Sequence, residues 1–244
     1  MPKKENNFYI TTDAPDITVS SPNYTQIDEN RTVTCNPSGN PDSYTYHKWQ
    51  HKSSFGSLIR EFGGNKTLIL PDVLKVLRYQ DSGEYICTAS NGIKDNGNKF
   101  EQTGSGYVIV KAQPVFTTDT INRVKQFGEI DKSVEIYVNV YSVPKFTSYI
   151  WEWDGKSTTQ NSAKYESSST PTLVVDKIHG KKVQLDGYKL TLTIQDLKTV
   201  DFTNYTVTLK SGFEDVSYTI ILESASRYII PRLTLYIQLF TQIL

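Results

Sequence analysis

The chain has 244 residues, enough for two domains of ordinary size or for one large domain built from strands. Its 26 basic and 26 acidic residues cancel, so the composition shows no electrostatic footprint for nucleic acid or for an anionic membrane surface. Sixteen tyrosines against a single methionine favour half-buried strands over helices.

The chain begins with MPKKENNFYITTDAP, in which no apolar run follows the basic residues. A secretory signal peptide needs such a run, so this stretch does not read as one. If the protein works outside the cell, we therefore expect the sequence to be a fragment or to be incomplete at its N-terminus.

Apolar and polar residues alternate along RTVTC in the first half and along SVEIYVNV, KLTLTI and VSYTIIL in the second. A period of two is typical of strands with one buried face. Turn-forming clusters such as NPSGNPDS and SNGIKDNGN separate these runs. The sequence therefore predicts an all-β protein.

The proline-containing stretch KAQPVFTTDT follows the strand-like GYVIV and marks a domain boundary near residue 112. We expect one domain over residues 14–112, a second over 113–224, and an apolar segment of uncertain role at 225–244. The halves repeat a pattern, because DSGEY in the first has a counterpart in DFTNY in the second. Two copies of one domain are expected.

Residues 78–90 read RYQDSGEYICTAS and place Asp81, Gly83, Tyr85 and Cys87 at every second position. These residues share one face as the chain enters a strand. The other cysteine is Cys35, and the cysteine count alone leaves open whether the two form a bridge or remain thiols.

Cys35, Trp49 and Cys87, with Tyr85 two residues before the second cysteine, resemble the core of the immunoglobulin superfamily. The resemblance implies two tandem sandwiches of packed sheets, compact and similar to I-set or constant-like domains. It implies a disulfide between Cys35 and Cys87, with Trp49 packed against it. It also implies a bond from the Tyr85 hydroxyl to backbone a few residues upstream.

The same resemblance assigns further core positions. It implies that Asp81 pairs with a basic residue on a neighbouring strand, for which Arg60 is our candidate. Gly83 suits a corner where the backbone approaches closely or adopts positive φ. The corresponding residues of the second domain are Trp151, Asp201 and Tyr205, whereas valines, Val138 and Val207, replace both cysteines. The second domain is therefore expected to be degenerate and held by apolar packing alone.

Surface positions suggest where the protein is modified and where it binds. Alternation from Trp49 and Cys87 sends four side chains outward, and we interpret them either as a partner-binding face or as an ordinary solvated face: Lys48, Gln50, Ile86 and Thr88. Four Asn-x-Thr sequons give candidate N-glycosylation sites: Asn23, Asn30, Asn65 and Asn204. A glycan on Asn204 is expected to be crowded by Tyr205.

The sequence gives no sign of catalysis. It lacks a phosphate-binding glycine loop, a nucleophile elbow and paired carboxylates, and its three histidines have no fitting partners for a metal. We expect no enzyme activity, no cofactor and no metal.

The resemblance implies an extracellular protein-binding module of a cell-surface adhesion or recognition receptor, with a function in immune recognition as one option. The partner would be a protein ligand or an identical chain on another cell. Residues 224–226, SAS, precede an apolar run and resemble a lipid-anchor signal, so membrane contact would come through that anchor or one missing from the sequence. The alternatives are a secreted soluble recognition protein and an intracellular structural array of the muscle type.

Overall fold

The structure is a computed structural model that describes residues 11–160 and 163–225. The SAS sequence extends past these ranges, and the apolar segment, apart from Ala225, lies outside them. The chain forms two compact units. The first comprises residues up to Lys111 together with Ile178–Val183, and the second comprises Ala112–Lys177 and the residues from Gln184 onward.

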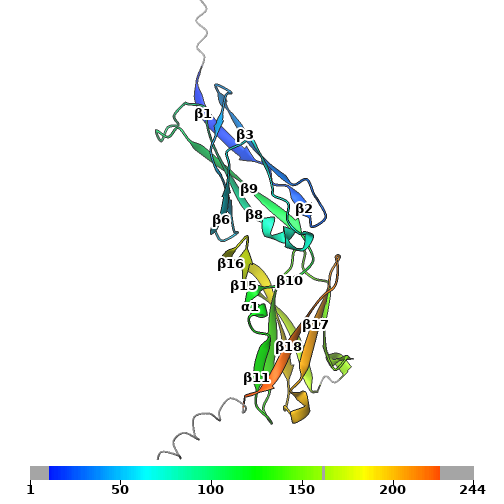
Figure 1. The fold of residues 1–244 in the computed structure, drawn as a ribbon. Helices are drawn as coiled ribbons and strands as arrows, with labels where there is room; N and C mark the ends of the chain where they lie inside the picture. The colour runs from blue at the N-terminus through cyan, green and yellow to red at the C-terminus, as the bar shows by residue number, and fades with distance from the viewer. Residues whose placement is uncertain (1–10, 161–162, 226–244) are drawn as a thin grey trace, which may run out of the picture. The chain divides into compact units, whose positions relative to one another are not determined.

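The first unit is built from short strands and one 3₁₀ helix. In chain order these are β1 (Asp13–Val19), β2 (Asn23–Thr25), β3 (Thr32–Asn40), β4 (Thr45–Tyr46), β5 (Trp49–Lys52), β6 (Leu58–Phe62), β7 (Thr67–Ile69), the 3₁₀ helix η1 (Lys75–Asp81), β8 (Gly83–Ser90) and β9 (Gln102–Lys111). One sheet has the order β1-β3-β7 and the other has the order β2-β9-β8-β5-β6, with β4 also paired to β8. Figure 1 shows β8 and β9 side by side within this second sheet.

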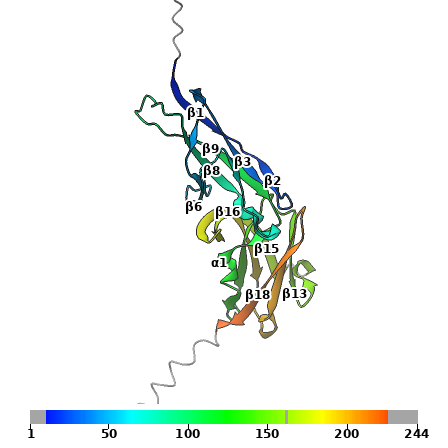
Figure 2. The same cartoon turned by 45° about the horizontal axis from the view of Figure 1, so that its top comes forward.

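The second unit repeats this plan and contains two strands of 14 residues, β15 and β16. Its elements are β10 (Val115–Phe116), α1 (Thr118–Ile121), β11 (Lys125–Gly128), β12 (Val134–Tyr141), β13 (Ser148–Trp153), β14 (Lys156–Ser157), η2 (Thr158–Gln160), β15 (Tyr165–Ile178), β16 (Lys181–Ile194), η3 (Thr199–Asp201), β17 (Asn204–Lys210) and β18 (Val216–Ser224). The sheets have the orders β10-β12-β16-β15 and β11-β18-β17-β13-β14. Figure 2 shows this unit from a second direction.

Each unit has one parallel strand pair in an otherwise antiparallel arrangement. β2 runs parallel to β9, and β11 runs parallel to β18. The short strand before each of them, β1 or β10, pairs in the opposite sheet. The first part of each unit therefore contributes to both sheets, and the predicted all-β class and repeated domain are confirmed.

Alternation of side chains places the cores between the sheets. Along β8 the burial pattern alternates strictly, with Tyr85 and Cys87 inward and Ile86 and Thr88 outward. Along β12 the inward side chains are apolar, and each is fully buried: Ile136, Val138 and Val140. Across the part of the chain that the structure describes, no helix is long and apolar enough to cross a membrane.

Candidate functional site

A disulfide joins β3 to β8 in the first unit. Cys35 and Cys87 are bonded, with their Cα atoms 6.0 Å apart, and both side chains are buried. Trp49, on β5, is buried in the same core cluster, and its indole Nε1 donates a hydrogen bond to the backbone oxygen of Asn65 at 2.8 Å. This core thus contains a covalent cross-link and an indole whose N–H is hydrogen-bonded.

The Asp81 carboxylate lies at the end of η1 and is completely buried. It forms an ion pair with Arg60, the candidate named from the sequence, and a second with Arg31 at 3.0 Å. Burial would raise the pKa of Asp81, but a hydrogen bond with His179 at 3.0 Å and the positive charges of Arg60 and Arg31 outweigh that effect and lower it. The Tyr85 hydroxyl donates to the backbone oxygen of Asp81 at 3.0 Å, which ties the corner to the start of β8.

Sequence reasoning missed Arg31, although a signal was present. Arg31 stands two residues before Val33 and four before Cys35, so strand alternation points all three side chains inward. A fully buried arginine requires a partner, because an unpaired buried charge is costly. The inward register of Arg31 would have identified it as a partner of Asp81.

His51 completes the cluster, and two hydrogen bonds orient its ring. Its Nε2 lies 3.1 Å from the Ser82 carbonyl oxygen and must donate, while its Nδ1 accepts from the Nε of Arg60 at 3.3 Å. Burial, reinforced by the charge of Arg60, lowers the pKa of His51 to about 4. The ring stacks on Tyr85 with centroids 4.4 Å apart.

Gly83 is required where this ring packs. Its φ is +148°, and a Cβ atom there would lie 2.6 Å from the Nε2 of His51 and 2.4 Å from the Lys52 carbonyl oxygen. Both the backbone conformation and the close contact exclude a side chain. The glycine of the DSGEY stretch is therefore explained by the histidine opposite it.

The second unit has the same corner with fewer charges. The Tyr205 hydroxyl donates to the backbone oxygen of Asp201 at 3.0 Å, and the Asp201 carboxylate pairs with Lys164 at 2.7 Å. Trp151 is buried, and among the residues that the structure describes its Nε1 has no hydrogen-bond partner. Val207 lies in the same apolar cluster.

The four outward residues named from the sequence lie on one face of the first unit. Gln50 on β5 pairs directly with Ile86 on β8, and Thr88 lies two residues further along β8. Lys48 immediately precedes β5. Lys48 forms an ion pair with Glu61 of β6 at 3.3 Å. The structure adds Tyr107 of β9 to this face, because it pairs with Glu84 and is 40% exposed.

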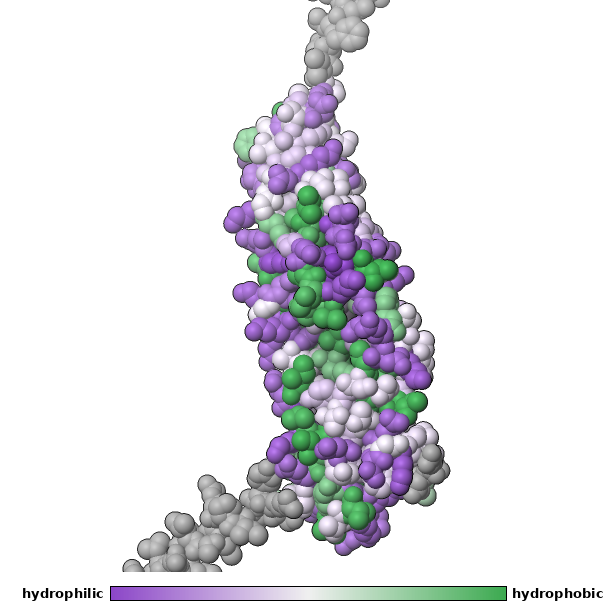
Figure 3. Space-filling model, turned by 45° about the vertical axis from the view of Figure 1, so that its right-hand side comes forward, coloured by the Kyte–Doolittle hydropathy of each residue, from purple (hydrophilic) through white to green (hydrophobic). Residues whose placement is uncertain are grey.

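Sequence reasoning did not find Tyr107 or Glu61, because membership of the face depends on which strands are neighbours. We define this face as the β5–β8 face, made of Lys48, Gln50, Glu61, Ile86, Thr88 and Tyr107. On the side of the protein drawn in Figure 3, hydrophobic residues are interspersed with hydrophilic ones. The β5–β8 face itself combines an aromatic and an aliphatic side chain with charged and polar ones, as non-obligate protein contacts do.

All four sequon asparagines are exposed: Asn23, Asn30, Asn65 and Asn204. The expected crowding at Asn204 is wrong, because the side chain of Tyr205 points into the core and that of Asn204 points away from it.

In the parts of the chain described, no group of three or more His, Cys, Asp and Glu side chains could hold a metal ion.

Comparisons with known proteins give the same picture. Residues 14–91 match the family model described as an immunoglobulin domain. No curated protein matches the sequence. Among solved structures, the complex of Dpr2 Ig1-Ig2 with DIP-Theta Ig1-Ig3 contains a chain that is 18% identical, with a TM-score of 0.55. The match covers 87% of this chain and 65% of that one.

Two further neighbours are less similar in structure. Titin Ig tandem domains A164-A165 are 19% identical with a TM-score of 0.49, and the match covers 88% of this chain and 98% of that chain. The insect immune protein hemolin is 17% identical with a TM-score of 0.39, over 91% of this chain and 49% of that one. The predicted resemblance to the immunoglobulin superfamily is therefore confirmed, by the family model for residues 14–91 and by the tandem immunoglobulin-like fold of the chain.

Proposed function

We propose that the protein is a binding module that works outside the cell, as part of a cell-surface adhesion or recognition protein. The observation that carries the proposal is the β5–β8 face. On it an exposed Tyr107 and a half-buried Ile86 stand among polar and charged side chains on adjoining strands. Aromatic residues surrounded by polar groups are the usual anchors of protein interfaces.

The disulfide supports the extracellular location. Structural disulfides persist in oxidising compartments and are rare in the cytosol. The four exposed sequons are compatible with export through the same compartments. The partner is a protein on another cell, either an identical chain or a different one, and the Dpr2 structure is titled as a complex between two immunoglobulin-domain proteins.

An intracellular structural array of the muscle type is the second candidate, because titin domains are among the structural neighbours. Alkylation of the protein in its own cells, without reduction, separates the candidates. If Cys35 and Cys87 are both blocked by the reagent, the protein is intracellular. If neither reacts, the extracellular proposal stands, and a soluble form in the medium would then favour a secreted recognition protein over an anchored one.

Binding is tested with multivalent full-length chain as the probe, applied both to beads coated with the same chain and to cells of the source tissue. We expect Ile86→Asp and Tyr107→Ala to weaken binding about tenfold, since each removes an apolar contact. Ile69→Asp is the matched control, because Ile69 is 72% exposed on the opposite sheet. Equal binding by Ile86→Asp and Ile69→Asp would contradict the assignment of the face.

A further inference from the structure

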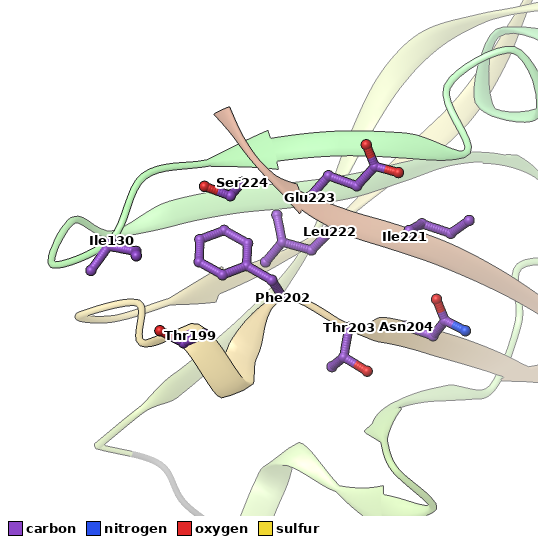
Figure 4. Close-up of a pocket in the computed structure, with 9 residues that line it drawn as sticks. All are labelled: Ile130, Thr199, Phe202, Thr203, Asn204, Ile221, Leu222, Glu223 and Ser224. Atoms are coloured by element: carbon purple, nitrogen blue, oxygen red, sulfur yellow. The ribbon is translucent and has the colours of Figure 1, made fainter. Parts of the chain in front are cut away.

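A groove with a mixed polar and apolar lining lies at one end of the second unit, between the η3 corner and the end of β18. It has a volume of about 490 Å³ and is lined by Ile130, Thr199, Phe202, Thr203, Asn204 and Ile221–Ser224. Figure 4 shows the Phe202 ring between the side chains of Ile130 and Leu222, with Asn204 further along the same segment, beside Ile221. Phe202 packs against the core with part of its surface and lines the groove with the rest.

The groove contains its own attachment point. Asn204 begins the sequon Asn204-Tyr205-Thr206, and its exposed side chain lines the groove together with Phe202, two residues earlier. Asn204 pairs with Ile221 across β17 and β18 on the outward side of this strand pair, so an adduct on the Asn204 amide would start beside Ile221 and close to the hydroxyls of Thr206 and Thr219. A substituent there would start in the same groove as Phe202, two residues along the chain from it.

We propose that this groove seats an N-linked carbohydrate attached to Asn204, with the first sugar packed against the Phe202 ring. The proposal depends on the proposed function in one respect, because the modification requires export. A pyranose ring has one face made largely of C–H groups, and this face gains by leaving water for an aromatic surface. Two hydroxyl-bearing residues also line the groove, Thr199 and Ser224, and hydroxyls of this kind can pair with sugar hydroxyls.

Attachment of the sugar forms one bond and breaks another. The Nδ2 of Asn204 forms a bond to the anomeric carbon of the sugar, and the bond from that carbon to a lipid-linked diphosphate donor breaks. The diphosphate leaves with the bonding electrons, and one amide proton of Asn204 is lost to the transferring enzyme. The side-chain oxygen of Asn204 stays in place.

The other sequons lack this environment. The residue two positions before Asn65 is Gly63, so a sugar on Asn65 would have no aromatic ring at the corresponding place. Asn65 is also exposed, which makes it a matched position for comparison. The groove therefore predicts a sugar that stabilises the second unit at Asn204, and no comparable effect at Asn65.

The test uses the full chain, directed through the secretory pathway of a glycosylating eukaryotic host. Peptide mapping measures the occupancy of each sequon, and the glycans are trimmed enzymatically to a single sugar. We expect Asn204 to be occupied and the single sugar to protect the amides of β18 from hydrogen exchange. Asn204→Gln should lower the thermal midpoint of the second unit by about 4–8 °C, and Asn65→Gln should not.

Phe202→Leu keeps the apolar bulk and removes the aromatic face. In this background, loss of the sugar should no longer change the midpoint. The proposal is overturned if Asn204 is unmodified while other sequons are occupied, or if the sugar stabilises wild type and Phe202→Leu equally. Because the host supplies the export, failure of the partner-binding proposal would appear in the binding assay and leave this stability result unchanged.

Discussion

Where the first unit joins its sheets with the Cys35–Cys87 disulfide, the second unit has Val138 and Val207. Residues near the Asp81 corner also have apolar counterparts in the second unit. At the position of the buried Arg31, four residues before the first of these core positions, the second unit has Val134.

The aromatic positions follow the same trend. At the position of His51, two residues after the core tryptophan, the second unit has Trp153. Apolar side chains thus fill in the second unit the places that charged and cross-linked groups fill in the first. The same strand order accommodates both kinds of core, but the two cores differ in the conditions that destabilise them. A core with a buried charge cluster and a disulfide responds to pH and to redox conditions, whereas an apolar core responds mainly to loss of volume.

The largest expected effect comes from removing the charge at the two equivalent aspartates. Asp81→Asn leaves the fully buried Arg31 without a counter-charge, and breaking such a pair costs about 3–5 kcal/mol. Asp201→Asn should cost about 1 kcal/mol, because its partner Lys164 is partly exposed and can turn to water. Urea unfolding, followed separately in each unit by hydrogen exchange, measures both, and equal losses would contradict the comparison.

The next effect is an acid sensitivity confined to the first unit. The folded-state pKa of His51 is about 4, below the ordinary value of 6.5, so only the unfolded state takes up a proton between these values. Stability should therefore fall as the pH drops from 6.5 to 4, by a total on the order of 3 kcal/mol. Because the pKa of Asp81 is also lowered, its contribution is lost only at still lower pH.

Unfolding free energies measured across this pH range test the assignment. His51→Gln should flatten the dependence in the first unit, and the partly exposed His47→Gln is the control that should leave it unchanged. An unchanged slope in His51→Gln would assign the acid sensitivity to another group. The second unit has no histidine in its core cluster and should show no such slope in this range.

The smallest effect separates the two buried tryptophans. Trp49→Phe loses the hydrogen bond to the Asn65 oxygen, whereas Trp151→Phe loses no such bond. Both changes leave a cavity, so the difference between them isolates the bond and should be about 1 kcal/mol. Thermal unfolding of the paired variants measures it. If Trp151→Phe is the more damaging change by a similar amount, the indole pairing is not what distinguishes the cores.

Local patterns in the sequence predict much of this fold. Strand alternation identifies the inward faces. The resemblance to the immunoglobulin superfamily implies the corner at Asp81 and Tyr85 and its equivalent at Asp201 and Tyr205. These features depend on residues close together in the chain. Strand alternation together with that resemblance therefore suffices for them.

Features that need a particular neighbour were less predictable. The partnership of Arg31 with Asp81 spans 50 residues, and the stacking of His51 on Tyr85 depends on the pairing of β5 with β8. The groove at Asn204 combines residues from the segments around positions 130, 202 and 222, so no local sequence pattern predicts it. The length of β15 and β16, 14 residues each against three for β7, also follows from strand pairing and not from composition.

The most direct test of the central difference between the units is the unfolding of the intact chain at neutral pH, with and without a reducing agent, followed by hydrogen exchange in each unit. Reduction of the Cys35–Cys87 bond should lower the stability of the first unit by about 2–5 kcal/mol and leave the second unit unchanged. Equal shifts in the two units, or no shift in the first, would contradict the conclusion that one core relies on a disulfide and the other on apolar packing.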